Sequence, residues 1–210
     1  APALALRGIA MAQMGDLSRA RDLLRRAGRA FGAKERLARA RCALAEAEIA
    51  LVTRDLGGTL QNLGTARAVL TVCNDRANAA HAGYLEARLL LLIGRLHDAR
   101  AVLAAIDRTD LSLPSQVGCE LVSAGIAIRR IDTETANAAL QRAAWITERA
   151  AIPALQAEVA KAARALREPL ARLIVGCRSQ PLRLDEVQAL LASDMLVIDA
   201  CRNALRSGAT

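Results

Sequence analysis

The residues best placed for chemistry surround one of the chain's two histidines. They recur at steps of three, four and three residues, as one face of a helix does, and are His81, Tyr84, Arg88 and Leu91. An imidazole, a phenol and a guanidinium among aliphatic side chains suit a groove that binds a peptide or a small anionic ligand. The alternative interpretation is an ordinary solvated face on which Tyr84 is a packing residue.

Neighbouring helices extend this face at corresponding positions. Glu48 lies on the predicted helix before it, and Arg129 lies on the predicted helix after it. If the helices stack in order, these side chains would line the same groove as the histidine. The predicted ligand- or partner-binding set is therefore His81, Tyr84, Arg88, Leu91, Glu48 and Arg129.

Sequence patterns for catalysis, metal binding and phosphate binding are missing. Neither His81 nor His97 has a cysteine or a second histidine at a metal-ligand spacing. No glycine is followed by Gly-Lys-Ser/Thr at the spacing of a phosphate-binding loop, and there is no G-x-S-x-G. We therefore predict that the protein is not an enzyme and holds no metal and no cofactor.

A five-residue pattern, A-(R/N)-x-φ-L with φ apolar or Ala, indicates the elements that position this face. It occurs four times, at intervals of 46, 33 and 37 residues. Apolar or small residues flank most copies three positions before and seven after, which makes one apolar stripe along a helix. Such intervals are typical of paired helices that bury a core by stacking. The copies begin at Ala20, Ala66, Ala99 and Ala136 and end at Leu24, Leu70, Leu103 and Leu140.

The composition favours an all-α fold. The 210 residues include one Trp, one Tyr and one Phe, and alanine, the best helix former, is abundant. No apolar run approaches the roughly 20 residues that a membrane-spanning helix needs. We predict helical hairpins along the chain, the first pairing residues 4–14 with 17–30 and the fifth pairing residues 153–167 with 170–177.

The repeated columns resemble the tetratricopeptide-repeat superfamily over about residues 3–150. Gly8, Ala87 and Ala124 match the small residue of the family's first helix, and the Ala and Leu of the pentad match the second helix. The family's usual first-helix Trp and closing Pro are missing. The resemblance implies a right-handed α-solenoid of about four or five antiparallel helical hairpins in residues 1–177, whose first helices line the concave face.

The C-terminal residues, 178–210, form a second predicted region. Residues 178–181 are predicted to be a linker, and Asp185 with Gln188 a capping box for a helix at 186–192. Residues 194–206 are then either a short β-hairpin or part of a last helix at 193–205. The hairpin alternative resembles the start of winged-helix DNA-binding domains in bacterial regulators. In those domains a strand ending in Asp leads through an Arg-containing turn to a second strand and a Gly.

The chain is basic, with a net charge of +8, and only Lys34 and Lys161 of its 29 basic residues are lysines. Codon bias in a GC-rich genome is one explanation, and attraction to nucleic acid or an acidic partner is the other. Phe31 is the one aromatic residue in the densest basic stretch, where single-strand binders need several. That stretch contains Arg19, Arg21, Arg25, Arg26, Arg29, Arg36, Arg39 and Arg41.

Five widely spread cysteines without a C-x-x-C pair predict small buried side chains in a reducing cytoplasm. No signal peptide is visible, although the chain begins at Ala1. We expect a non-enzymatic interaction or sensing module of a bacterial cytoplasmic transcriptional regulator. Its groove would bind a protein segment, a peptide or a small anionic effector, with no membrane partner. The alternative is a nucleic-acid-binding helical-repeat protein that uses its arginine-rich surface; the oligomeric state stays open.

Overall fold

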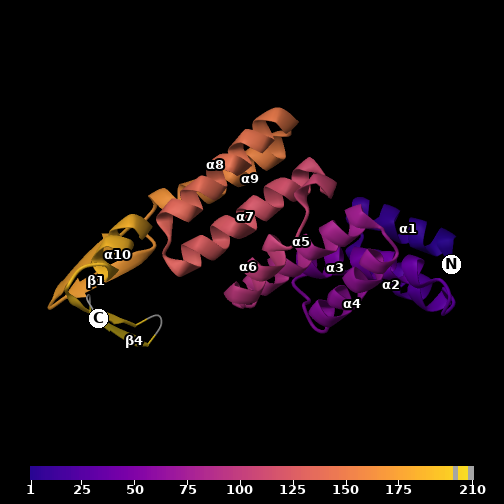
Figure 1. The fold of residues 1–210 in the computed structure, drawn as a ribbon, viewed down its shortest axis with the longest axis horizontal. Helices are drawn as coiled ribbons and strands as arrows, with labels where there is room; N and C mark the ends of the chain where they lie inside the picture. The colour runs from indigo at the N-terminus through magenta and orange to yellow at the C-terminus, as the bar shows by residue number, and fades with distance from the viewer. Residues whose placement is uncertain (201–202, 208–210) are drawn as a thin grey trace. The chain divides into compact units, whose positions relative to one another are not determined.

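The computed structural model describes residues 1–200 and 203–207, which form helices followed by two small β-hairpins (Figure 1). The mostly helical prediction is confirmed. Two compact units divide the chain, one of residues 1–115 and one from Gln116 onward. Within the described ranges, no helix has the length and apolar character needed to cross a membrane.

In the first unit, each helix packs against the next one along the chain. The largest core cluster lies among α3, α4 and α5 and includes Leu44, Leu63, Leu70 and Leu85. The elements are α1 (Pro2–Gln13), α2 (Leu17–Ala30), α3 (Arg36–Thr53), α4 (Thr59–Val72), α5 (Arg76–Leu92), α6 (Leu96–Ala104) and the 3-10 helix η1 (Arg108–Asp110).

The repeated sequence columns form the helix contacts, as predicted. All four alanines that begin the pentad are buried, as are the four leucines that end it. The small residues of the first helices, Gly8, Ala87 and Ala124, are buried too. Small side chains let two helix backbones approach closely, and the leucine one turn later fills the space beside them.

Glycines allow the tight turns between paired helices. Gly15 and Gly94 adopt φ values of 87° and 82°, which a side chain would disfavour. After Gly15, the Asp16 carboxylate accepts a hydrogen bond from the backbone N–H of Arg19, as expected of a helix cap. Ile131 occupies the corresponding turn position before α8 and is held at a φ of 60°.

The second unit begins within α7 (Leu113–Arg130) and continues through α8 (Thr133–Ala150) and α9 (Pro153–Arg167). These helices share two apolar clusters, of which one joins Val117, Ala143 and Val159. Glu120, on α7, is only 2% exposed, and the Arg142 guanidinium lies 2.9 Å from its carboxylate. This pairing neutralises a charge that would be costly to bury alone.

The prediction of a fifth helical hairpin is wrong. Residues 170–177 were expected to be a helix and residues 178–181 a linker, but they form most of a β-hairpin of β1 (Ala171–Val175) and β2 (Arg178–Leu182). Pro169 ends the preceding helix, and the β-branched pair Ile174 and Val175 precedes Gly176, which adopts a φ of 58° in the turn. The predicted boundary between residues 177 and 178 therefore falls inside this turn.

The hairpin alternative for the C-terminal residues is confirmed, and the helix at 193–205 is excluded. Strands β3 (Leu196–Asp199) and β4 (Ala204–Ser207) pair antiparallel. The expected arginine of the turn, Arg202, and the closing Gly208 lie outside the described residues.

The predicted short helix is present as α10 (Leu184–Leu191), but its cap differs from the prediction. The Glu186 carboxylate, not Asp185 with Gln188, accepts a hydrogen bond from the Arg183 backbone N–H at 2.7 Å. The Gln188 side chain instead reaches α8, where its oxygen accepts from the backbone N–H of Thr133 at 2.8 Å. Among the cysteines, Cys42 and Cys119 are buried as predicted, and Cys73 and Cys177 are exposed. Cys201 lies outside the described residues.

Candidate functional site

The predicted face on α5 brings His81 together with Glu48, as expected. His81 Nε2 lies 2.6 Å from a carboxylate oxygen of Glu48 on α3. His81 Nδ1 lies 3.1 Å from the hydroxyl of Ser115, at the start of α7. One imidazole therefore bridges side chains from three helices.

The partners determine how the hydrogen bonds run. A carboxylate only accepts, so His81 Nε2–H donates to Glu48. In the neutral imidazole Nδ1 then accepts from the Ser115 hydroxyl. Ser115 in turn receives a hydrogen bond from the Ser112 hydroxyl at 3.1 Å. The result is a continuous relay of four side chains.

A serine that contacts a histidine, which in turn contacts a carboxylate, is also the arrangement of catalytic triads with a serine nucleophile. The Ser115 residue is only 7% exposed, however, so its hydroxyl is shielded from a substrate. The arrangement therefore serves best as a tie between helices. Ser115 was missed by the sequence analysis because it lies 34 residues beyond His81, at the start of a different hairpin.

The other predicted residues have separate surroundings. Arg88 donates a hydrogen bond to the Tyr84 hydroxyl at 3.2 Å, and the Tyr84 ring packs against the main core cluster. Leu91 is 9% exposed and counts among the buried residues, so it presents little surface to a ligand. Arg129 belongs to the second unit, whereas Glu48, His81, Tyr84 and Arg88 belong to the first.

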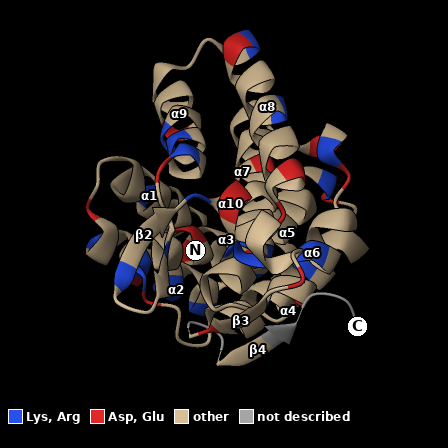
Figure 2. Cartoon of the chain, turned by 90° about the vertical axis from the view of Figure 1, so that its left-hand side faces the viewer, with Lys and Arg blue, Asp and Glu red and all other residues tan. Residues whose placement is uncertain are grey.

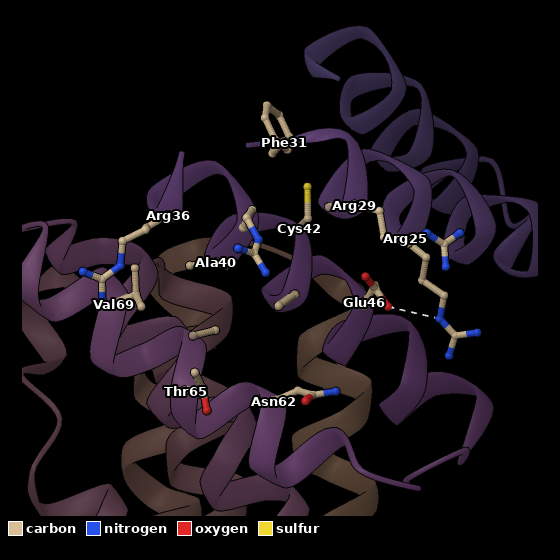
Figure 3. Close-up of a pocket in the computed structure, with 14 residues that line it drawn as sticks. Arg25, Arg29, Phe31, Arg36, Ala40, Cys42, Glu46, Asn62, Thr65 and Val69 are labelled. Atoms are coloured by element: carbon tan, nitrogen blue, oxygen red, sulfur yellow. Dashed lines mark hydrogen bonds and ion pairs between the residues drawn. The ribbon is translucent and has the colours of Figure 1, made fainter. Parts of the chain in front are cut away.

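A pocket of about 900 Å³ lies on α2, α3 and α4, away from the predicted residues (Figure 3). We call it the arginine pocket because four arginines line it. Its inner wall is made of small apolar side chains, and α4 adds an amide and a hydroxyl. The lining consists of Arg25, Gly28, Arg29, Phe31, Arg36, Arg39, Ala40, Cys42, Ala43, Glu46, Asn62, Thr65, Ala66 and Val69.

Glu46 is the single acid of the arginine pocket. Its carboxylate lies 3.3 Å from Arg25 Nε. Among the described residues, Arg29, Arg36 and Arg39 have no ion-pair partner, and all three are exposed. Four guanidinium groups and one carboxylate leave an excess of three positive charges around this pocket.

Burial affects two titratable groups in the pocket wall. It raises the pKa of Glu46 above the usual 4.5, and the nearby guanidinium of Arg25 only partly opposes this effect. Burial, reinforced by the carboxylate of Glu46, also raises the pKa of the Cys42 thiol above 9.0. Cys42 therefore stays protonated at neutral pH and forms wall rather than a nucleophile.

The sequence contained a signal for this pocket. Arg25 and Arg29 are four residues apart and Arg36 and Arg39 are three apart, so each pair lies on one helix face. In the sequence, however, these arginines are part of one continuous basic stretch, residues 19–41, which suggests a single basic surface. The structure divides it, because Arg21, Arg26 and Arg41 form ion pairs with Asp55, Asp22 and Asp75.

Lysine and arginine residues are spread over helices of both units, with aspartate and glutamate residues among them (Figure 2). No group of three or more His, Cys, Asp or Glu side chains within residues 1–200 and 203–207 is arranged to hold a metal ion. Comparisons with protein-family models, curated proteins and solved structures found no match to this chain.

Proposed function

We propose that this chain is a non-enzymatic ligand-sensing or protein-interaction module that binds an anionic partner in the arginine pocket. The observation that carries the proposal is the charge of the pocket, four arginines against one glutamate in a space of about 900 Å³. Arginine is suited to this role because its planar guanidinium binds carboxylates and phosphates through two parallel hydrogen bonds.

The scaffold that we propose is a right-handed α-solenoid of tetratricopeptide-like hairpins. Its support is a repeated spacing between interacting side chains. Arg21 with Asp55, Arg41 with Asp75, and Arg76 with Asp110 are each separated by 34 residues, and His81 lies 33 and 34 residues from its two partners. Tetratricopeptide repeats are roughly 34 residues long, so equivalent positions of successive hairpins would meet in this way.

The biological setting that we propose is a bacterial cytoplasmic transcriptional regulator. The β3–β4 hairpin, whose first strand ends in Asp199, agrees with the resemblance to the start of a winged-helix domain. A ligand that binds one packing arrangement of the hairpins more tightly than another would shift the array toward it. This shift would reposition an attached DNA-binding domain.

Direct nucleic-acid binding by the basic stretch has less support. Arg21, Arg26 and Arg41 are neutralised by aspartates, and Arg25 is paired with Glu46. Phe31 is 8% exposed, so its ring offers little surface for stacking with a base.

The test is calorimetric titration with citrate and pyrophosphate at low salt. Both carry several negative charges, and we expect at least one of them to bind the wild-type chain. The double variant Arg36→Glu/Arg39→Glu should lose at least about tenfold in affinity, equivalent to about 1.4 kcal/mol. Arg7→Glu/Arg100→Glu is the charge-matched control, because Arg7 on α1 and Arg100 on α6 are exposed and lie outside the pocket. Equal losses in both variants would refute the pocket as the binding site.

A further inference from the structure

We propose that the arginine pocket recognises two carboxylates separated by an apolar spacer, and that Glu46 occupies the place of one of them in the unliganded protein. This inference rests on the proposed function, since it assigns a ligand chemistry to the same pocket. Two kinds of ligand carry two carboxylates joined by an apolar spacer. One is a free aliphatic dicarboxylate, and the other is a protein segment in which apolar residues separate two acidic ones.

The arrangement of charge indicates two anionic groups. Arg25 and Arg29 come from α2 and lie on one side of the pocket, whereas Arg36 comes from the start of α3 and lies on the other (Figure 3). A compact anion offers its charge at one place. A ligand with an anionic group at each end can contact both sides at once, and the second contact then adds to the first as an intramolecular event.

The wall between the two sides indicates what joins the anionic groups. Ala40 and Cys42, which lie between Arg36 and Arg29 in Figure 3, are both buried, and Ala43, Ala66 and Val69 are further apolar residues of the lining. A polar linker placed there would lose water contacts without gaining hydrogen bonds from these side chains. An aliphatic linker would instead remove apolar surface from water.

The anion that the pocket already holds is a carboxylate. Glu46 lies against Arg25, although burial makes its ionised form less favourable than that of an exposed glutamate and raises its pKa. A carboxylate supplied by a ligand can form the same contact with Arg25 without being part of the pocket wall. The Glu46 side chain is then displaced and, with its raised pKa, is more easily protonated than an exposed glutamate.

The experiment is a calorimetric series with α,ω-dicarboxylates from succinate to sebacate, together with octanoate as a monocarboxylate and pyrophosphate as a compact anion. We expect affinity to reach a maximum at one spacer length. At that length the dicarboxylate should bind at least about tenfold more tightly than octanoate and pyrophosphate.

Two variants assign the effect to the pocket. Arg36→Glu/Arg39→Glu should remove the dependence on spacer length, because only the side formed by Arg25 and Arg29 then keeps its positive charge. Glu46→Gln should tighten binding by about fivefold, because it removes the competing carboxylate and leaves the fold intact. Circular dichroism of each variant checks that its helices are retained.

The remaining outcomes are decisive. If affinity does not depend on spacer length, or if octanoate or pyrophosphate binds as tightly as the best dicarboxylate, the inference is wrong while the anion-binding function stands. If none of these anions, citrate included, binds, both are wrong. A peptide with acidic residues at the preferred separation distinguishes the sources: tighter binding than the dicarboxylate assigns the ligand to a protein segment, and weaker binding to a small molecule.

Discussion

Glu46 is a carboxylate held among arginines, and yet burial raises its pKa above the usual 4.5. The charged form of this residue is therefore less favourable in the folded chain than in the unfolded one. Because its pKa is higher in the folded state, protonated Glu46 adds to the free energy of unfolding. This contribution is fully present at pH values below the pKa of the unfolded state, and it is lost as pH rises through the higher pKa of the folded state. Asp55, Asp75 and Asp107 behave in the opposite way, because arginine or hydrogen-bonding partners lower their pKa.

The Glu46→Gln variant should reveal this contribution. Its free energy of unfolding relative to wild type should increase as pH is raised from about 4 to 7, because wild type alone ionises an unfavourably placed carboxylate. Urea unfolding at several pH values, followed by circular dichroism, measures the difference, and comparison with wild type cancels the aspartates. A difference that falls with pH would show that Arg25 dominates over burial.

At the same scale, the sequence predicted contacts within a helix better than contacts between hairpins. The spacing of His81, Tyr84 and Arg88 placed them correctly on α5, and Glu48 was expected nearby. No local sequence pattern marked Ser115 as a partner of His81. Its contact with His81 depends on how the helices pack and not on the residues next to it in the sequence. Cys73 is predicted to be buried like the other cysteines, but it lies just after the last residue of α4, where the chain leaves the apolar stripe.

Among the helices, α1 and α2 show why a small residue is needed at the centre of a hairpin. A Cβ atom added at Gly8 would lie 2.9 Å from Leu24 Cγ and 3.2 Å from the carbonyl oxygen of Ala20. The first distance is shorter than van der Waals contact, and the second atom belongs to a helix backbone that cannot easily move. Gly64, within α4, has no neighbouring atom within 4 Å of such a position.

A matched pair of substitutions tests this helix contact. Gly8→Ala should lower the free energy of unfolding by about 1–3 kcal/mol, because overpacking outweighs the gain in helix propensity. Gly64→Ala should leave stability unchanged or raise it by up to about 1 kcal/mol. Thermal or urea unfolding distinguishes the two, and a stabilised Gly8→Ala protein would mean that the helices separate at no cost.

The helices themselves were largely predictable, since alanine content, glycine turns and the apolar stripe agree with one another. The β1–β2 hairpin was not, because its strands alternate weakly and follow a long helical series that suggested one more helix. The decisive local features were Pro169 and the sequence Ile174-Val175-Gly176, which favour a strand and a turn. The regular series of helices before residue 170 favours one more helix, and this pattern conflicts with the local strand and turn features.

For the molecule as a whole, interactions at a separation of 33 or 34 residues join one hairpin to the next. The relay of Glu48, His81 and Ser115 involves more helices than any of the other pairs named above, since it connects residues of α3, α5 and α7. The pentad intervals of 46, 33 and 37 residues are less regular, because the segments between pentads vary in length. The side-chain pairs instead share one spacing, of 33 or 34 residues.

Replacing His81 should weaken the entire first unit. His81→Ala leaves Glu48 and the shielded Ser115 without their shared partner, and we expect a loss of about 1–3 kcal/mol in the free energy of unfolding. The second histidine is the control: His97 is exposed on α6, and His97→Ala should change stability by less than about 0.5 kcal/mol. Urea unfolding measures both, and similar losses would argue against the relay as a tie.

The contact between Gln188 and α8 has a mechanical consequence. The first N–H groups of a helix have no partner within the helix, and here the N–H of Thr133 is satisfied by a side chain 55 residues later. A force that pulls α10 away from α8 would therefore break this hydrogen bond and leave the Thr133 N–H without it, while the Asp132 cap of α8 would remain. Displacement of the C-terminal β-hairpins would therefore be felt at the start of α8 through one amide group, besides the covalent link through α9.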